Sequence, residues 1–204
     1  MDAADKKIGL VILAAGESSR LGFYPKQLLE FKGKTLIRHA AENALSSKAD
    51  LVSVVLGAQA ESLKDGIEDL AVEIVINENW PDGMASSLQK GLHKLLAIEP
   101  DLSALCITLC DQPLVDSGII DRLIETFQTG DSLIVASAYA ETSGVPAVFS
   151  SRLFDELLAL ESSQGAKKVI VKHLDRVKKI PVPEAFYDID TRHDFAEFLE
   201  KNPD

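Results

Sequence analysis

Short apolar runs alternate with segments of helical periodicity along most of this chain, and this alternation is the feature that most restricts its fold. The runs Ile8–Leu13, Leu51–Leu56 and Ala104–Leu109 have the length and composition of buried strands. Between them, Lys34–Leu45 and Ser86–Ile98 each place their apolar residues on one helical face. Strands that alternate with helices build a largely parallel sheet with helices on both faces. The sequence therefore predicts an α/β fold.

The remaining segments continue this pattern without a break. Further strands are predicted at Val72–Ile76, Leu133–Ala136, Val145–Phe149 and Val177–Val182, and further helices at Ser117–Thr126, Ser151–Leu160 and Gly165–Leu174. Near the end, Thr191 followed by Asp194 forms a weak capping box for a closing helix. No repeat, low-complexity stretch or linker interrupts the chain, so residues 1–204 are expected to form one domain.

The composition excludes several classes of protein. A net charge of −11 disfavours nucleic-acid and anionic-membrane partners, because both would repel the chain. Cys106 and Cys110, the only cysteines, lie on or beside an apolar segment and are expected to be reduced core thiols. With neither a signal-peptide layout nor 18 consecutive apolar residues, the chain is expected to be cytoplasmic.

The first strand runs into the stretch LAAGESSRLG, which has the character of an anion-binding turn. Its spacing fits neither a dinucleotide fingerprint nor a P-loop. Gly16 is expected to let the chain turn with positive φ, so that backbone amides approach an anion. Arg20 and Lys26 would bring two cations to the same loop. A surface turn with solvated basic residues is the alternative.

Carboxylates follow the buried strand at Ala104–Leu109 and precede the last helix. Asp111 comes directly after an apolar strand, where a charge needs a cationic partner. Asp188 and Asp190 are separated by one residue, so in an extended chain they face the same way. Mg²⁺ typically takes one or two carboxylates together with phosphate oxygens. A metal–nucleotide site is thus predicted, with helix capping as the alternative for each carboxylate.

Five motifs occur in the same order as in a known family. These are LAAGESSRLG…PKQLL, NENWPDGMASSL, CDQPLV, GVPAVF and DIDTRHD. Together they resemble the molybdenum cofactor cytidylyltransferases, which belong to the MobA-like and MocA-like nucleotidyltransferases, over about Ile8 to Phe198. The resemblance implies one Rossmann-like, three-layer nucleotidyltransferase domain. It also implies transfer of CMP from CTP to the terminal phosphate of molybdopterin with release of pyrophosphate, and delivery of the product to a molybdenum hydroxylase.

The resemblance also implies roles for individual residues. Leu13, Ala14, Ala15 and Gly16 would line the base and ribose, and Gly83 and Ser87 would help to fix the nucleotide. Arg20 and Lys26 would bind the triphosphate. Asp111 would coordinate Mg²⁺ together with Asp190, with Asp188 as the second choice.

The chain departs from the family pattern at three places. Ala15 stands where GTP-specific relatives have glycine, and its methyl group narrows the space beside the base, which favours a pyrimidine. Three residues separate Gly22 from Lys26 where the family has two, which bears on the reach of the lysine. In the acceptor half, SSQGAKK lacks the usual aspartate and carries Lys167 in place of arginine, which bears on the identity of the acceptor.

Three alternatives stay open at this point. The enzyme could use GTP, it could use a sugar or alcohol phosphate as acceptor, or the protein could bind a pterin cofactor without chemistry. Trp80 is interpreted as a packing anchor, with stacking on substrate as its alternative role. The basic stretch KKVIVKHLDRVKK is interpreted as a solvated face, with reception of an anionic acceptor as its alternative role.

Overall fold

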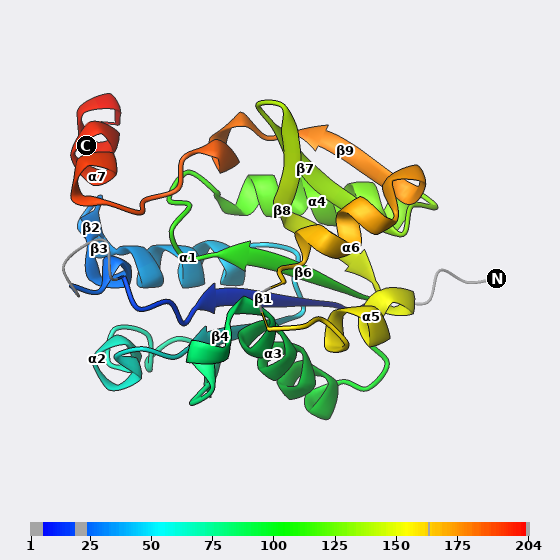
Figure 1. Ribbon diagram of the computed structural model, residues 1–204, viewed down its shortest axis with the longest axis horizontal. Helices are drawn as coiled ribbons and strands as arrows, with labels where there is room; N and C mark the ends of the chain where they lie inside the picture. The colour runs from blue at the N-terminus through cyan, green and yellow to red at the C-terminus, as the bar shows by residue number, and fades with distance from the viewer. Residues whose placement is uncertain (1–5, 19–23, 163, 203–204) are drawn as a thin grey trace.

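A seven-stranded sheet forms the centre of the computed structural model, which describes residues 6–18, 24–162 and 164–202 (Figure 1). The strand order is β5-β4-β1-β6-β8-β7-β9. The strands are β1 (Ile8–Ala14), β4 (Leu51–Leu56), β5 (Glu73–Ile76), β6 (Ala104–Leu109), β7 (Ile134–Tyr139), β8 (Thr142–Ser150) and β9 (Val177–Pro181). β5, β4, β1 and β6 are parallel, β8 is antiparallel to both of its neighbours, and β9 is parallel to β7. The predicted mostly parallel α/β sheet is confirmed.

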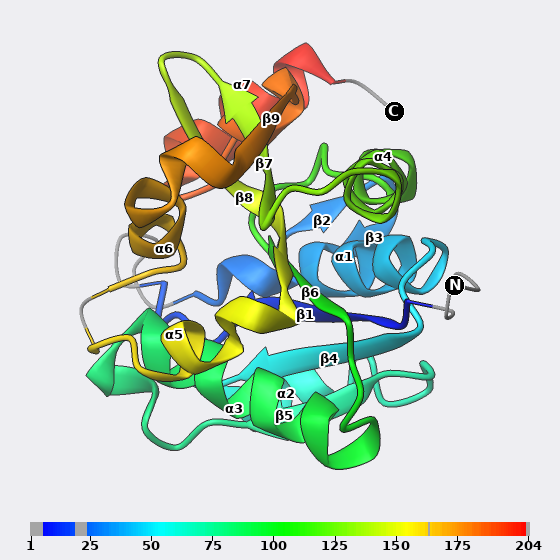
Figure 2. The same cartoon turned by 90° about the vertical axis from the view of Figure 1, so that its right-hand side faces the viewer.

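Helices cover both faces of the sheet, as Figure 2 shows in a view turned by 90°. They are α1 (Leu36–Leu45), α2 (Ala60–Lys64), α3 (Met84–Ile98), α4 (Ser117–Thr129), α5 (Phe154–Leu158), α6 (Lys167–Lys172) and α7 (Arg192–Lys201). Alternate residues of β1 point to opposite faces. Leu10 therefore belongs to the core beneath α1 and α4, whereas Val11 belongs to the core beneath α3, α5 and α6.

Several boundaries differ from those that periodicity predicts, most by a few residues, and two of the differences have a clear structural reason. The helix expected from Lys34 begins at Leu36, because Lys34–Thr35 pairs with Glu30–Phe31 in a small antiparallel ribbon and the Thr35 hydroxyl caps the helix. β7 and β8 are longer than predicted and meet in a hairpin. Their ends carry polar and small residues that complete the ladder, so apolar runs marked only the buried parts.

The closing helix has the predicted cap. Thr191 accepts a hydrogen bond from the backbone N–H of Asp194, and the Asp194 carboxylate accepts one in return from the N–H of Thr191. This capping box fixes the chain direction directly after Asp190, which bears on the site below. Among the described residues, no helix combines the length and the apolar character that a membrane crossing requires.

Candidate nucleotide and metal site

The site lies at the carboxyl ends of β1 and β6, two parallel neighbours in the middle of the sheet. In their register Leu13 is paired with Leu109, so the turn after Ala14 and the segment Cys110–Asp111 leave the same edge. The ends of parallel strands are where ligands bind in sheets of this type. The fold thus brings the turn that contains Gly16 close to Asp111, the aspartate that follows the buried strand β6.

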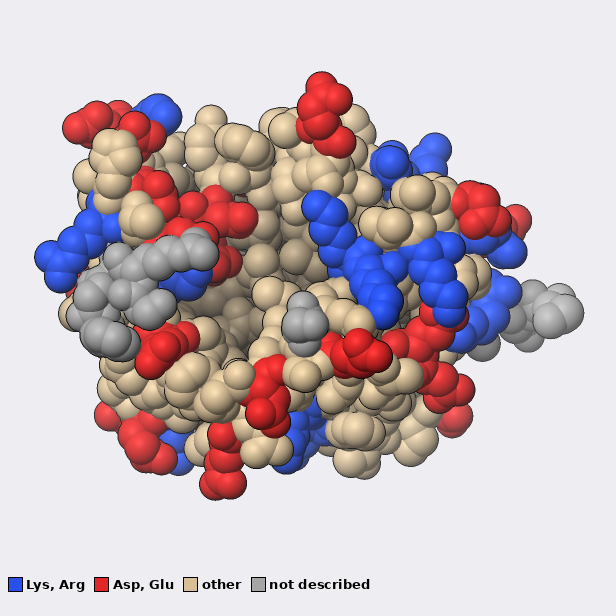
Figure 3. All heavy atoms as spheres, viewed as in Figure 1, with Lys and Arg blue, Asp and Glu red and all other residues tan. Residues whose placement is uncertain are grey.

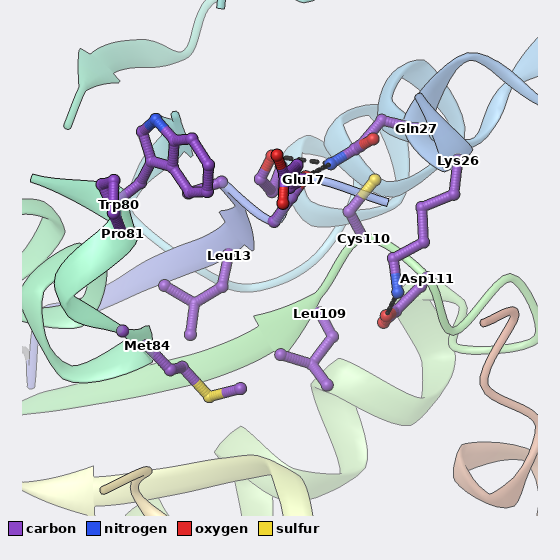
Figure 4. A pocket seen from close by; sticks show the side chains of 14 residues that line it. Leu13, Glu17, Lys26, Gln27, Trp80, Pro81, Met84, Leu109, Cys110 and Asp111 are labelled. Carbon is purple, nitrogen blue, oxygen red and sulfur yellow. Dashed lines mark hydrogen bonds and ion pairs between the residues drawn. The ribbon is translucent and has the colours of Figure 1, made fainter. Parts of the chain in front are cut away.

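A cavity of about 370 Å³ opens at this edge (Figure 4). Among its lining residues are seven predicted site residues, namely Leu13, Ala14, Ala15, Gly16, Lys26, Gly83 and Asp111. Trp80, for which the sequence left stacking on substrate as the alternative role, also lines the cavity. Sequence reasoning gave no nucleotide role to the other lining residues, Glu17, Gln27, Pro81, Met84, Leu109 and Cys110. The cavity therefore has an apolar floor with charged groups at the Lys26–Asp111 side.

Lys26 bridges two carboxylates that are far apart in the sequence, Asp111 and Asp190. Its ammonium donates to Asp111 Oδ2 and, at 2.9 Å, to Asp190 Oδ1. The Lys26 and Asp111 side chains are 16% and 17% exposed, so solvent screens their ion pair little. Lys26 reaches the acid pair despite the longer spacing from Gly22, because the residues Lys26–Leu28 form a short 3₁₀ turn beside the cavity.

The electrostatics of this cluster follow from burial and charge. Burial opposes the charge on Lys26, but the carboxylates of Asp111 and Asp190 outweigh it and raise the pKa of the lysine above its ordinary value. Burial raises the pKa of Asp188 to about 6, with help from the negative charges of Asp111 and Asp190. The surroundings thus favour the charged form of Lys26 and disfavour the ionised form of Asp188.

The acid pair offers hard oxygen atoms of the type that a divalent cation takes. Asp111 Oδ1 is buried and has no hydrogen-bond partner within the described chain, and such an orphaned oxygen is costly unless a ligand satisfies it. Asp111 and Asp190 together therefore fit a divalent ion. No cluster of three or more His, Cys, Asp or Glu side chains is poised for a metal in the described ranges, so Asp188 does not complete a three-ligand set there.

The turn after β1 differs from the prediction at Gly16. Its φ is not positive; the left-handed residue of the described part of the turn is Ser18, with φ of 58°. A Cβ on Gly16 would meet no atom within 4 Å, so this glycine leaves open space beside the cavity instead of supplying a left-handed turn. Ser18 holds its unusual conformation because its hydroxyl oxygen accepts a hydrogen bond of 3.0 Å from the N–H of Lys26.

The segment NENWPDG forms the opposite wall. Ser87 is buried and accepts a hydrogen bond from the fully buried Asn77, so it supports the turn from below and is not among the cavity-lining residues. Gly83, with φ of 111°, does line the cavity at the start of α3. Asn77 was missed by sequence reasoning, and its one signal was a polar residue between an apolar strand and a Trp-Pro turn.

Trp80 and Ala15 both pack against Gly57. A Cβ built on Gly57 would lie 2.6 Å from Trp80 Cβ and 2.8 Å from Ala15 Cβ, so only glycine allows this approach. Both residues line the cavity. Trp80 is therefore a wall of the site as well as a packing residue.

A second, smaller cavity of about 220 Å³ shares Leu13, Met84 and Leu109 with the first. Its lining is mainly apolar and includes Gly165, Ala166 and Lys167 of the SSQGAKK segment. In Figure 3 lysine and arginine side chains gather beside the hollow, over α6 and β9. The basic segment of this region consists of Lys167, Lys168, Arg176, Lys178 and Lys179, which are exposed and have no ion-pair partner within the described chain.

Two further predictions have clear outcomes. Cys106 and Cys110 are free and buried, as expected, and burial raises the pKa of Cys106 to about 12 and that of Cys110 further still. Arg20 lies outside the described residues, so its predicted contact with the triphosphate stays a prediction.

Comparison with known proteins gives this geometry a family. The MobA-like NTP transferase domain matches residues 10–177. Nicotine blue oxidoreductase of Paenarthrobacter nicotinovorans is 30% identical over 169 residues, which cover 79% of this chain and 80% of that protein. The molybdenum cofactor guanylyltransferase of Vibrio cholerae is 24% identical and matches over 95% of this chain and 92% of its own.

Solved structures agree with this assignment. Rv0371c from Mycobacterium tuberculosis superposes with a TM-score of 0.84 at 29% identity, over 97% of this chain and 99% of that one. Rv0371c has also been solved in complex with manganese, and that structure matches with a TM-score of 0.79 at 27% identity over 95% and 98% of the two chains. The resemblance read from the five motifs is confirmed at the level of the family, and the activity class is that of a nucleotidyltransferase. The chain belongs to the MobA-like NTP transferase family.

Proposed function

We propose that the protein transfers CMP from CTP to the terminal phosphate of molybdopterin and releases pyrophosphate. The observation that carries this proposal is the meeting of Lys26, Asp111 and Asp190 at the edge of a cavity built by β1 and β6. A nucleoside triphosphate needs a cation for its phosphates and carboxylates for its metal, and this corner of the molecule offers both.

The reaction is an in-line displacement at phosphorus. An oxygen of the acceptor phosphate attacks the α-phosphorus of CTP, a new P–O bond forms, and the bond to the oxygen bridging the α- and β-phosphates breaks. The electron pair leaves with pyrophosphate. The attacking oxygen is already ionised at neutral pH, so the site needs no general base, and catalysis comes from positioning and charge neutralisation.

The charged residues have separate roles in this scheme. Lys26 would neutralise the leaving pyrophosphate together with Arg20. Asp111 and Asp190 would hold Mg²⁺, because their oxygens are hard ligands and Asp111 Oδ1 lacks a protein partner within the described residues. When bound, the ion would supply Lewis-acid stabilisation of phosphate charge. For Mg²⁺ and the triphosphate to bind in this way, the ion would take the place of the Lys26 ammonium at the two carboxylates, and the ammonium would turn to the phosphates.

The walls of the cavity favour a small base. Leu13, Ala14, Ala15 and Gly16 would line the base and ribose, and Gly83 would bound the opposite side. Ala15 adds a methyl group where GTP-specific relatives have glycine, and it packs close to Trp80 across Gly57. CTP therefore fits better than GTP on grounds of volume. Ser87 would act only indirectly, through Asn77 and the turn it supports.

The acceptor would enter from the second cavity. That cavity is adjacent to the first, because both are lined by Leu13, Met84 and Leu109, so a group bound there would lie next to the nucleotide. The cations of the basic segment, led by Lys167, suit an acceptor that carries phosphate. A molybdenum hydroxylase would be the recipient of the product.

Pyrophosphate release tests the proposal. Purified protein is assayed with Mg²⁺, each of the four ribonucleoside triphosphates, and either molybdopterin or a sugar phosphate as acceptor. The proposal expects release with CTP and molybdopterin above all other pairs. Preference for GTP or for a sugar phosphate would contradict the substrate assignment, and no release with any pair would favour a binding protein.

A second assay tests for an oxidoreductase, because one relative carries that name. In it, NAD(P)H oxidation is followed in parallel with pyrophosphate release. Turnover in that assay alone would contradict the transferase assignment.

A further inference from the structure

Among the polar side chains that line the cavity, Gln27 is the most buried, and the proposed mechanism does not use it. It is 2% exposed and directly follows Lys26 in the short 3₁₀ turn. The two side chains diverge: Lys26 extends to the acid pair, and Gln27 points to the turn after β1 (Figure 4). A buried amide has to satisfy its hydrogen bonds within the protein, so its contacts report what it holds in place.

The hydrogen bonds of the Gln27 side chain go to the end of β1 and the turn that follows it. Gln27 Nε2 donates to the carbonyl oxygen atoms of Ala14 and Gly16, each at 3.0 Å. Its Oε1 accepts from the Ser18 hydroxyl at 3.3 Å. Two carbonyl oxygens can face only the amide nitrogen, which fixes the orientation of the side chain.

The carbonyl groups of the four residues from Leu13 to Gly16 all accept hydrogen bonds from protein donors. The oxygen of Leu13 accepts from the N–H of Cys110 and that of Ala15 accepts from the N–H of Ala58. Gln27 takes the two that remain, at Ala14 and Gly16. Carbonyl oxygens carry partial negative charge, so their retention on protein donors keeps them from facing an anionic ligand in the cavity.

The same network joins the turn to the lysine. The Ser18 hydroxyl oxygen accepts from the N–H of Lys26 while its hydrogen is donated to Gln27. Ser18, Lys26 and Gln27 therefore connect the turn that would receive the nucleotide to the cation that would receive its phosphates. A shift of either one displaces the other.

We infer that Gln27 is a positioning residue for the nucleoside triphosphate: it holds the turn after β1 in its binding form and sets the turn in register with Lys26. This inference rests on the proposed function only in requiring a triphosphate at the site, and it does not depend on the choice of base or acceptor. It assigns to Gln27 the pre-organisation that an electrostatic site needs.

Gln27→Glu is the direct test, because it keeps the shape and replaces the donor by an oxygen that repels both carbonyl groups. Gln27→Met removes the donor without adding charge. Gln89→Glu is the matched control: Gln89 Nε2 also donates to two carbonyl oxygens, of Leu158 and Leu160 at 2.9 Å each, between α3 and α5. Equilibrium binding of each triphosphate, KM, kcat and melting temperature are measured for all variants.

Both glutamate variants are expected to melt earlier than the unmodified protein. Only the Gln27 variants should bind triphosphate more weakly, by about tenfold or more for the loss of two buried hydrogen bonds, with KM affected more than kcat. Triphosphate binding by folded Gln27 variants within twofold of that by Gln89→Glu would overturn the inference. If neither Gln27 variant folds, Ser18→Ala decides, since it removes one link without burying a charge. For Ser18→Ala we expect about a threefold rise in KM, and an unchanged KM would overturn the inference.

Failure of the unmodified protein to bind any triphosphate would have a different meaning, because it would refute the proposed function.

Discussion

The two adjacent cavities differ in how the positive charges beside them are balanced. On the β1–β6 side, Lys26 is largely buried and held by two carboxylates. On the α6–β9 side, Lys167, Lys168 and their neighbours in the basic segment are exposed and have no carboxylate partner in the described chain. In the first arrangement the positive charge is already offset by carboxylates, and in the second the positive charge is left available. This contrast agrees with a nucleotide-and-metal side that must be rigid and an acceptor side that must attract an anion.

Removal of the buried carboxylate should have the largest effect. Asp111→Asn keeps the shape but loses the charge, so turnover should fall about 10²–10³-fold while the fold survives. Pyrophosphate release and circular dichroism measure the two outcomes. Asp131→Asn, on an exposed loop, is the control and should leave turnover unchanged. A folded Asp111→Asn protein with full turnover would remove this residue from the mechanism and erase the contrast.

Lys26→Met tests whether the ammonium and a metal ion compete for the same carboxylates. Without the lysine, Asp111 and Asp190 repel each other, so the variant should melt earlier in the absence of metal. Mg²⁺ should then raise its melting temperature more than that of the unmodified protein. A ligand at 100 times its dissociation constant adds about 2.7 kcal/mol of stability.

Thermal melts over a Mg²⁺ series give the comparison for Lys26→Met. Lys48→Met, which removes a pair with Glu125 in which both side chains are about half exposed, serves as control. Equal Mg²⁺ shifts in all three proteins would show that the ion binds elsewhere.

Charge reversal on the α6–β9 side should weaken binding of the acceptor and leave binding of the nucleotide unaffected. The double variant Lys167→Glu/Lys168→Glu is expected to raise KM for a phosphorylated acceptor by roughly tenfold at low salt, less at high salt. KM for the nucleotide should stay within twofold. Lys64→Glu/Lys90→Glu makes the same change of net charge on exposed helical positions away from α6. The contrast between the two sides fails if both double variants behave alike.

The smallest effect is expected at the base. Ala15→Gly removes one methyl group, and its transfer free energy of ~0.8 kcal/mol corresponds to about a fourfold change in the preference for CTP over GTP. The ratio of kcat/KM for the two nucleotides is the measurement. Ala14→Gly shortens the neighbouring side chain and should lower both values together. An unaltered ratio in Ala15→Gly would place base selection on other residues.

Sequence periodicity predicted the architecture because burial of a sheet between helices leaves a pattern in the chain. The boundaries that it missed lie where polar residues take part in strands, as at Lys34–Thr35 and the β7–β8 hairpin. The five motifs predicted most of the cavity wall in advance, since strand ends carry their polar residues at recognisable positions. Sequence reasoning could not tell that the Ser87 side chain is buried against Asn77, because a serine at a helix start looks the same whether it faces a ligand or the interior.

What the sequence determined by itself is the fold class, the family and the identity of the charged groups, because each leaves a local signature in residue type and spacing. Only the tertiary structure decided which of those groups meet. Asp111 and Asp190 are 79 residues apart, and they share Lys26 because β6 and the segment before α7 end at the same edge. The role of Gln27 was likewise found only in the tertiary structure. Its amide nitrogen donates to two backbone carbonyl oxygens, which every residue has, so no pattern of side chains could predict those contacts.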